Sequence, residues 1–278
     1  MKKLLSFITI AILALALTAC GGADEKSTEK ETKDGDKTIV VGASAVPHAE
    51  VLEAAKPLLK EKGINLEIQV FQDYILPNVA LHDKELDANY FQTPGYLDLQ
   101  LEDNPDFDFV SIGEIHQEPI GIYSKKYKSL KELPTGAKII MSNSLSDHGR
   151  ILPIFEKAGL IKLKEGVGAN ARVEDIIENP KKLDFSTLIE AKLLASSFEA
   201  GEGDAVVINL NYALEGDIDI KNTLIGQEDK DVVPANLVVV NSADKNNKEL
   251  KTLVEVLKSE EIQKFIQDKY EGAVLSVK

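Results

Sequence analysis

Histidine and cysteine are the residue types in this 278-residue chain that could bind a transition metal. The histidines, His48, His82, His116 and His148, are far apart in the sequence, and the single cysteine, Cys20, cannot complete a zinc–thiolate set. The spacing therefore argues against a metal centre, and we expect no cofactor.

Catalytic motifs are the second kind of chemistry to look for. The chain contains no G-x-S-x-G, no H-E-x-x-H and no G-x-G-x-x-G after a predicted strand. A hydrolase or a transferase needs a nucleophile and a base that are held together, and the sequence offers no such set. We therefore predict that the protein is not an enzyme.

Composition and charge restrict the partners. Hydrophobic residues make up 44% of the chain and its mean hydropathy is -0.11, which is enough apolar material for one large or two modest domains. The formal net charge is -14, and no basic patch suited to neutralising phosphates is evident. We expect no binding to nucleic acid.

The N-terminus has the features of an export signal. Lys2 and Lys3 form a positive region, and residues 4–19 form an apolar run that only Ser6, Thr9 and Thr18 interrupt. This run of roughly 16 residues is shorter than the ~20 that a membrane-spanning helix needs, and it ends in small residues. We predict a cleaved signal peptide over residues 1–19.

The four residues at 17–20, Leu-Thr-Ala-Cys, resemble the lipobox of bacterial lipoproteins, in which the cysteine thiol is acylated, for example with palmitate, and becomes the first residue. The alternative is a buried free cysteine inside an ordinary signal peptide, but the small residues on both sides of Cys20 favour lipidation. The following residues up to Lys37 include no large aliphatic side chain. We therefore expect a flexible tether over residues 20–38 and a lipid anchor on the extracytoplasmic face of the cell membrane.

Short apolar or alternating runs predict strands in the rest of the chain. They lie at residues 39–43, 66–70, 107–112, 138–141 and 205–208. Helical patterns separate them, and this alternation favours an α/β fold, which about 240 residues beyond the tether suit as two domains.

Two helices are predicted in most detail. The first follows residues 39–43, carries Leu52, Ala55 and Leu59 on one face and ends at Gly63, although Pro57 should kink it or stop it early. The second covers residues 246–270, where apolar residues recur at helical spacing.

Eight blocks of sequence are similar, in order along the chain, to the methionine-binding lipoprotein family of ABC importers. They are VPHAE at 46–50, FQDY at 71–74 with PN at 77–78, DANYFQ at 87–92, EPIGIYS at 118–124, GRIL at 149–152, GLIKL at 159–163, VINLNYA at 207–213 and ANLVVV at 235–240. Each block is short, but together they cover nearly the whole chain after the tether.

This resemblance implies a two-lobed periplasmic-binding-protein-like fold of the α/β class, with a ligand cleft between lobes that crossover strands join. Lobe I would comprise residues 39–121 and a return segment at 236–278, and lobe II residues 122–235, with crossings near 120–124 and 234–240. The implied function is to capture methionine, in its L and also its D form, and to deliver it to an ABC permease and its ATPase subunit. We expect a monomer.

A pocket for a free amino acid must bind a carboxylate, an ammonium group and a side chain. The family match assigns the carboxylate to Arg150, near the start of a predicted helix, although an isolated arginine is more often in a salt bridge. Asn209 and Asn236 could accept hydrogen bonds from the ammonium, with turn or strand-end chemistry as the alternative.

The side-chain slot is assigned to Tyr74, Phe91 and Tyr96, because a thioether sulfur contacts aromatic rings favourably, by about 0.3 to 1.5 kcal/mol. Without the family match these aromatics would be read as core residues. For His48 the sequence leaves three alternatives open, a helix cap, a hinge contact or a ligand contact, and we do not include it in the predicted site.

Three positions depart from the family pattern. Thr93 stands where members usually have histidine, which makes the slot roomier or differently polar. Asp147 replaces an asparagine and either attracts a ligand ammonium or caps the helix that follows. Pro234 stands where members often have an aromatic residue. Thr93 and Asp147 therefore join the predicted site.

Because of these three differences from the family pattern, the sequence does not decide whether the ligand is methionine, another amino acid or a methionine-containing dipeptide. A surface adhesin or chaperone lipoprotein is the competing class, since it would share the anchor and tether without needing the pocket.

Overall fold

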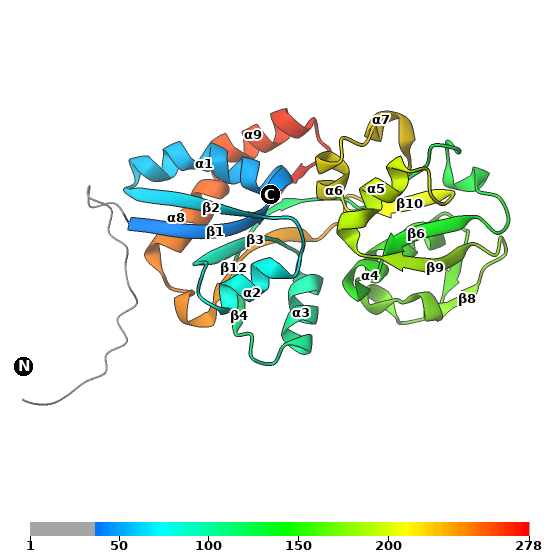
Figure 1. The fold of residues 1–278 in the computed structure, drawn as a ribbon, viewed down its shortest axis with the longest axis horizontal. Coiled ribbons are helices and arrows are strands. Elements are labelled where there is room, and N and C mark those ends of the chain that lie inside the picture. Colours follow the sequence, from blue (N-terminus) through cyan, green and yellow to red (C-terminus); the bar gives the residue numbers. More distant parts are fainter. Residues whose placement is uncertain (1–36, 278) are drawn as a thin grey trace, which may run out of the picture.

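The computed structural model describes residues 37–277, so the predicted signal peptide, Cys20 and nearly all of the tether lie outside the described residues. Within this range two main sheets form two lobes that lie side by side (Figure 1). Every helix in the described part is too short or too polar to span a bilayer.

Lobe I is built on a six-stranded mixed sheet in the order β13-β4-β12-β3-β1-β2. Strand β1 pairs in parallel with β2 and β3, whereas β12 pairs antiparallel with β3 and β4. The strands are β1 (Lys37–Ser44), β2 (Ile64–Phe71), β3 (Ala88–Gln92), β4 (Phe109–Gln117), β12 (Ala235–Asn241) and β13 (Leu275–Ser276).

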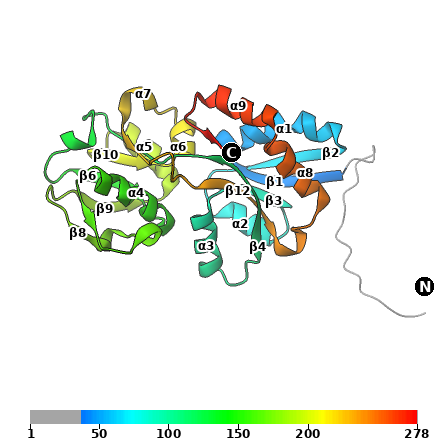
Figure 2. The same cartoon turned by 180° about the vertical axis from the view of Figure 1, so that it is seen from behind.

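Helices cover both faces of this sheet (Figures 1 and 2). Residues Val238 and Val240 of β12 pack with the helices on one face, and Leu237 and Val239 with those on the other, as the two-residue period of a strand requires. The helices of the first face are α1 (Glu50–Glu61), α8 (Lys248–Leu257) and α9 (Glu260–Tyr270), and those of the second are α2 (Leu76–His82) and α3 (Pro94–Asp103).

Lobe II is built on a five-stranded sheet in the order β11-β5-β10-β6-β9. Its elements are β5 (Gly121–Tyr123), β6 (Lys138–Ser142), α4 (Leu145–Lys157), β9 (Asp184–Ile189), α5 (Leu194–Glu199), β10 (Ala205–Ile208), α6 (Leu210–Glu215), α7 (Ile220–Thr223) and β11 (Leu224–Gln227), with a separate pair formed by β7 (Lys162–Leu163) and β8 (Ile176–Glu178). Alternate residues of β10 pack towards α4 and towards α5 and α6. Both sheets are therefore buried on both faces.

Several predicted elements are confirmed and others need correction. Strands were predicted correctly at 138–141 and 205–208, but the strand predicted from Phe107 begins at Phe109. The early stop at Pro57 is wrong, because Pro57 lies on the exposed side of α1 and the helix continues to Glu61. The single helix predicted over 246–270 is two helices, since the Ser259 hydroxyl accepts from the Ile262 backbone N–H and starts α9.

The chain passes between the lobes twice (Figure 2). It leaves the lobe I sheet after Gln117 and enters the lobe II sheet at Gly121, and it returns between Gln227 and Ala235. The second crossing precedes the expected 234–240 segment, because β12 is hydrogen-bonded on both sides within lobe I. Residues 118–120 and 228–234 are therefore the two connections between the lobes, which we call the hinge.

Candidate functional site

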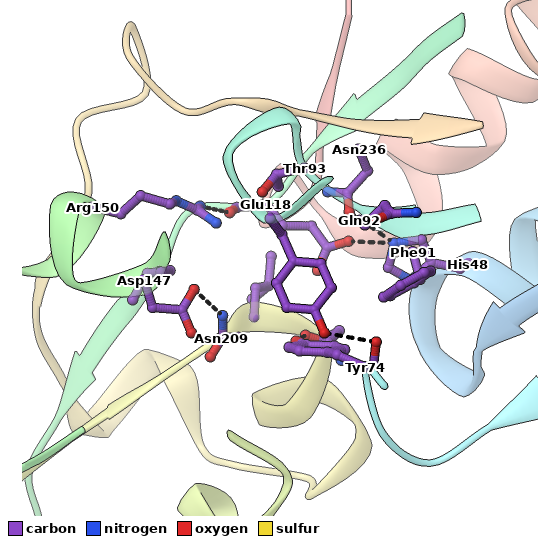
Figure 3. A pocket seen from close by; sticks show the side chains of 14 residues that line it. His48, Tyr74, Phe91, Gln92, Thr93, Glu118, Asp147, Arg150, Asn209 and Asn236 are labelled. Atoms are coloured by element: carbon purple, nitrogen blue, oxygen red, sulfur yellow. Dashed lines mark hydrogen bonds and ion pairs between the residues drawn. The ribbon is translucent and has the colours of Figure 1, made fainter. Parts of the chain in front are cut away.

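A pocket lies where the two lobes meet, and the space between its walls, open solvent included, is about 420 Å³ (Figure 3). Residues from both lobes and from the hinge line it. The lining includes every residue predicted from sequence for the ligand site: Tyr74, Phe91, Thr93, Tyr96, Asp147, Arg150, Asn209 and Asn236. It also includes six residues that were not predicted: His48, Gln92, Glu118, Ile120, Leu210 and Asn211.

Tyr74, Phe91 and Tyr96 form the aromatic wall of the pocket, which belongs to lobe I. The centroid of each ring lies 5.9 Å from those of the other two. The Tyr96 hydroxyl donates to the Tyr74 carbonyl at 2.8 Å, so the two residues hold each other in place. Such a wall offers edges and faces of rings to an apolar or thioether side chain.

Thr93 borders this wall at the start of α3. Its backbone is extended, Pro94 is the first residue of the helix, and its hydroxyl makes no helix-capping hydrogen bond. The half-buried hydroxyl lies at the pocket, in the place where a larger side chain would narrow the slot.

Arg150 lies in the second turn of α4, which begins at Leu145, so it is near the start of the helix as predicted but beyond the free backbone N–H groups of the first turn. The preceding Gly149 is required by packing: a Cβ there would lie 1.8 Å from the carbonyl oxygen of Ala169. This close approach of the 168–170 turn fixes the rotation of α4 and with it the direction of Arg150 into the pocket (Figure 3).

The guanidinium of Arg150 already has protein partners. Its Nε donates to Oε1 of Glu228 at 3.1 Å, and its Nη2 donates to Oε2 of Glu228 at 2.7 Å. Nη2 also donates to the Glu118 carbonyl at 2.8 Å. Burial lowers the pKa of Arg150, but the hydrogen bond and charge of Glu228 outweigh it, so the pKa is raised and the group stays charged. Among the described residues none accepts a hydrogen bond from Nη1 of Arg150, so this atom is available to donate to a ligand.

Asp147 is 6% exposed and faces the same pocket from the first turn of α4. Its Oδ1 accepts from Nδ2 of Asn209 at 3.2 Å, while its Oδ2 is buried without a hydrogen-bond partner among residues 37–277. Ser144, not Asp147, is the N-cap residue, so the helix-cap alternative is wrong. We call Asp147, Arg150 and Asn209 the charged wall of the pocket, which belongs to lobe II.

A hydrogen-bond network forms the floor at the hinge. Oε1 of Glu118 lies 2.6 Å from Nε2 of His116 and 3.1 Å from Nε2 of His48, and the latter atom also lies 3.1 Å from Oδ1 of Asn236. Tyr90 bonds Nδ1 of His116 through its hydroxyl. When Glu118 is ionised, its carboxylate and the Asn236 amide oxygen only accept, so both histidines then carry their proton on Nε2.

Burial lowers the pKa of His48 to about 4 and that of His116 to about 3, so both rings are neutral at pH 7. Burial also raises the pKa of Glu118. The histidine–carboxylate contacts are therefore hydrogen bonds from neutral rings, not ion pairs. One nitrogen each of His48 and His116 and one carboxylate oxygen of Glu118 lie within 4.8 Å of one another, a spacing that could hold a metal ion. The wide separation of the histidines in the sequence was therefore a poor argument against a metal centre.

The unpredicted polar residues had a sequence signal. Gln92, Glu118 and Asn211 lie inside the blocks DANYFQ, EPIGIYS and VINLNYA, where polar side chains stand in otherwise buried segments. Such residues must find partners or a ligand once buried. His48, which the sequence left undecided, is buried in the hinge network and lines the pocket.

Comparison with known proteins identifies relatives over nearly the full chain. Residues 39–277 match the model of the NlpA lipoprotein family. The methionine-binding lipoprotein MetQ of Bacillus subtilis (strain 168) is 44% identical over 279 residues, which covers 100% of this chain and 99% of the relative.

Solved structures are similar in the same range. A nutrient-binding protein from Burkholderia cenocepacia bound to methionine is 39% identical with a TM-score of 0.81, and covers 86% of this chain and 100% of its own. A periplasmic substrate-binding protein of an ABC transporter from Coxiella burnetii is 36% identical with a TM-score of 0.80, at 86% and 100% coverage. The two-lobed α/β fold predicted from the sequence is thereby confirmed.

Proposed function

The chain belongs to the NlpA lipoprotein family, and from this premise we propose that it is the solute-binding lipoprotein of an ABC importer that captures methionine between its lobes. The observation that carries the proposal is the pairing of unsatisfied groups in one pocket. Within the part of the chain that the structure describes, Nη1 of Arg150 has no acceptor and Oδ2 of Asp147 has no hydrogen-bond partner. A donor and an acceptor of opposite charge suit the two charged ends of an amino acid.

The rest of the pocket suits the ligand side chain. The aromatic wall lies opposite the charged wall, and its rings can contact a thioether, a contact worth about 0.3 to 1.5 kcal/mol. Asn209 and Asn236 would complete the recognition of the ammonium group. We assign the protein a binding role and no catalytic step.

The wider role follows from the family. The predicted lobe bounds, 39–121 with 236–278 for lobe I and 122–235 for lobe II, shift slightly, because Gly121 pairs within the lobe II sheet and Ala235 within the lobe I sheet. We place on Cys20 a lipid that holds the protein on the extracytoplasmic face of the membrane. Acting as a monomer, it would deliver the ligand to a permease and its ATPase subunit. The name of the relative from Bacillus subtilis and the ligand of the structure from Burkholderia cenocepacia support methionine as the ligand, and the ABC-transporter protein from Coxiella burnetii supports the importer role.

Calorimetry on the full chain in detergent, after unfolding and refolding to remove carried ligand, tests the proposal. The panel should contain L- and D-methionine, other amino acids and glycyl-methionine. Tight binding of methionine alone supports the proposal, and binding of only another compound would keep the importer role and replace the ligand. Binding of no compound in the panel would contradict the proposal and favour an adhesin or chaperone.

A further inference from the structure

Tyr74 is the residue of the aromatic wall that reaches across the cleft. Its hydroxyl donates to Oδ1 of Asn211, on α6 of lobe II, at 2.6 Å. Its ring also lies 5.0 Å from that of Tyr212, on the same helix. These contacts join segments 137 residues apart that come from different lobes.

Asn211 is held at two points. Its backbone N–H is hydrogen-bonded to the Glu118 carboxylate at the hinge, and its side-chain oxygen accepts from Tyr74. Because the amide oxygen is occupied by Tyr74, the NH2 end of the same amide must point the other way. Nδ2 is buried without an acceptor among the described residues, and Asn211 lines the pocket.

A buried amide N–H without an acceptor is rare in folded proteins and indicates a missing partner. A charged donor on the lobe II side of the pocket, Nη1 of Arg150, also has no acceptor among residues 37–277. Two donors on one wall suit the two oxygens of a carboxylate.

We propose that the Tyr74 hydroxyl is a positioning group, made effective by lobe closure, that turns the Asn211 amide so that Nδ2 donates to the ligand carboxylate beside Arg150. The inference rests on the proposed function, since it assumes an amino-acid ligand. Tyr74 would then have two roles, since its ring lines the side-chain slot and its hydroxyl orients the Asn211 amide. Because the hydroxyl and the amide come from different lobes, closure of the lobes would be needed for this recognition of the ligand carboxylate.

The matched pair of variants is Tyr74→Phe and Tyr212→Phe. Both keep a ring at the lobe contact, but the Tyr212 hydroxyl lies 3.5 Å from the Gln72 carbonyl and does not line the pocket. In calorimetry and stopped-flow binding with methionine, Tyr74→Phe should bind roughly 10-fold more weakly, chiefly through faster dissociation. Tyr212→Phe should stay within about 2-fold of the wild type.

The double variant separates positioning from packing. If the hydroxyl acts through the amide, Tyr74→Phe added to Asn211→Ala should weaken binding by less than about 2-fold further, because the two losses share one interaction. Methioninamide, whose carboxylate is replaced by a neutral amide, is the second readout. Asn211→Ala should weaken methionine binding at least about 5-fold more than methioninamide binding, since donors bond charged acceptors more strongly.

Three results would overturn the inference. The Tyr74→Phe variant could bind methionine as tightly as the wild type, or the affinity losses of Tyr74→Phe and Asn211→Ala could be fully additive in the double variant. The third is an Asn211→Ala variant that loses equal affinity for methionine and for methioninamide. In each case the wild type still binds and the proposed function survives. A wild-type chain that binds neither ligand would overturn the proposed function and this inference together. Melting curves of each variant show that it is folded under the binding conditions.

Discussion

The two walls of the pocket differ in kind. On the lobe I side the lining is aromatic or uncharged at pH 7, with Tyr74, Phe91 and Tyr96 as its main surface. On the lobe II side Asp147 and Arg150 bring opposite charges. One lobe therefore offers contacts to a ligand side chain and the other to its charged groups, so a complete site exists only when the lobes are closed.

Removing Arg150 should disable the charged wall and have the largest effect. Arg150→Ala is expected to weaken methionine binding roughly 100-fold or more and to destabilise the fold by about 3 to 5 kcal/mol, because Glu228, 5% exposed, would be left as a buried unpaired charge. Calorimetry and thermal unfolding measure the two losses.

The variant Arg150→Ala with Glu228→Gln separates these effects. Removing the unpaired charge should restore much of the stability and none of the binding. Methionine affinity equal to that of the wild type in this double variant would remove the carboxylate role from Arg150.

The hinge network that joins the walls should be sensitive to acid. In the unfolded chain His48 takes up a proton below its ordinary pKa of 6.5, but in the folded chain only below about 4. Between these values the unfolded state binds more protons, so stability falls as the pH falls, by on the order of 3 kcal/mol for this group. His116, with a pKa of about 3, acts in the same direction, and the raised pKa of Glu118 opposes it above pH 4.5.

Urea unfolding at steps from pH 7 to pH 4 measures this loss. His82→Gln, which changes an exposed histidine, should leave the slope unchanged, whereas His48→Gln should flatten it. A wild-type free energy of unfolding that stays constant from pH 6.5 to pH 4 would show that the buried histidines do not titrate as described.

Asp147→Asn keeps the shape of the charged wall and removes one charge. Binding of methionine should weaken about 10-fold, or ~1 to 2 kcal/mol, because an ammonium group bonds a carboxylate more strongly than an amide. N-acetylmethionine lacks the ammonium and serves as the control ligand in the same titration. An equal loss for both ligands would mean that Asp147 does not contact the ammonium.

A change in the aromatic wall should have the smallest effect. Phe91→Leu keeps an apolar surface and loses the ring, so methionine affinity should fall about 5-fold, or ~1 kcal/mol, while alanine affinity should change by less. Phe107→Leu, outside the pocket, is the matched control. If alanine and methionine lose equal affinity, the ring does not contact the ligand side chain.

The sequence alone determined the α/β class and the bounds of β10, and the resemblance of its short motifs to a known family assigned the eight predicted lining residues. These predictions depend on local signals. Two-residue alternation indicates a strand, and a short motif can be read from its residue types even when the neighbours of those residues in space are unknown. Even Thr93 and Asp147, which depart from the family pattern, could be placed at the pocket, because Thr93 follows Gln92 and Asp147 lies three residues before Arg150.

Only the tertiary structure decided the partners of those residues. Arg150 meets Glu228 across 78 residues, His48 meets Asn236 across 188, and Tyr74 meets Asn211 across 137. Such pairs depend on where the chain crosses between the lobes and on how α4 is rotated by the packing at Gly149. The physical reason is that a side chain's type states which bonds it can make, whereas burial and the course of the chain decide which partner it meets and which atom is left for a ligand.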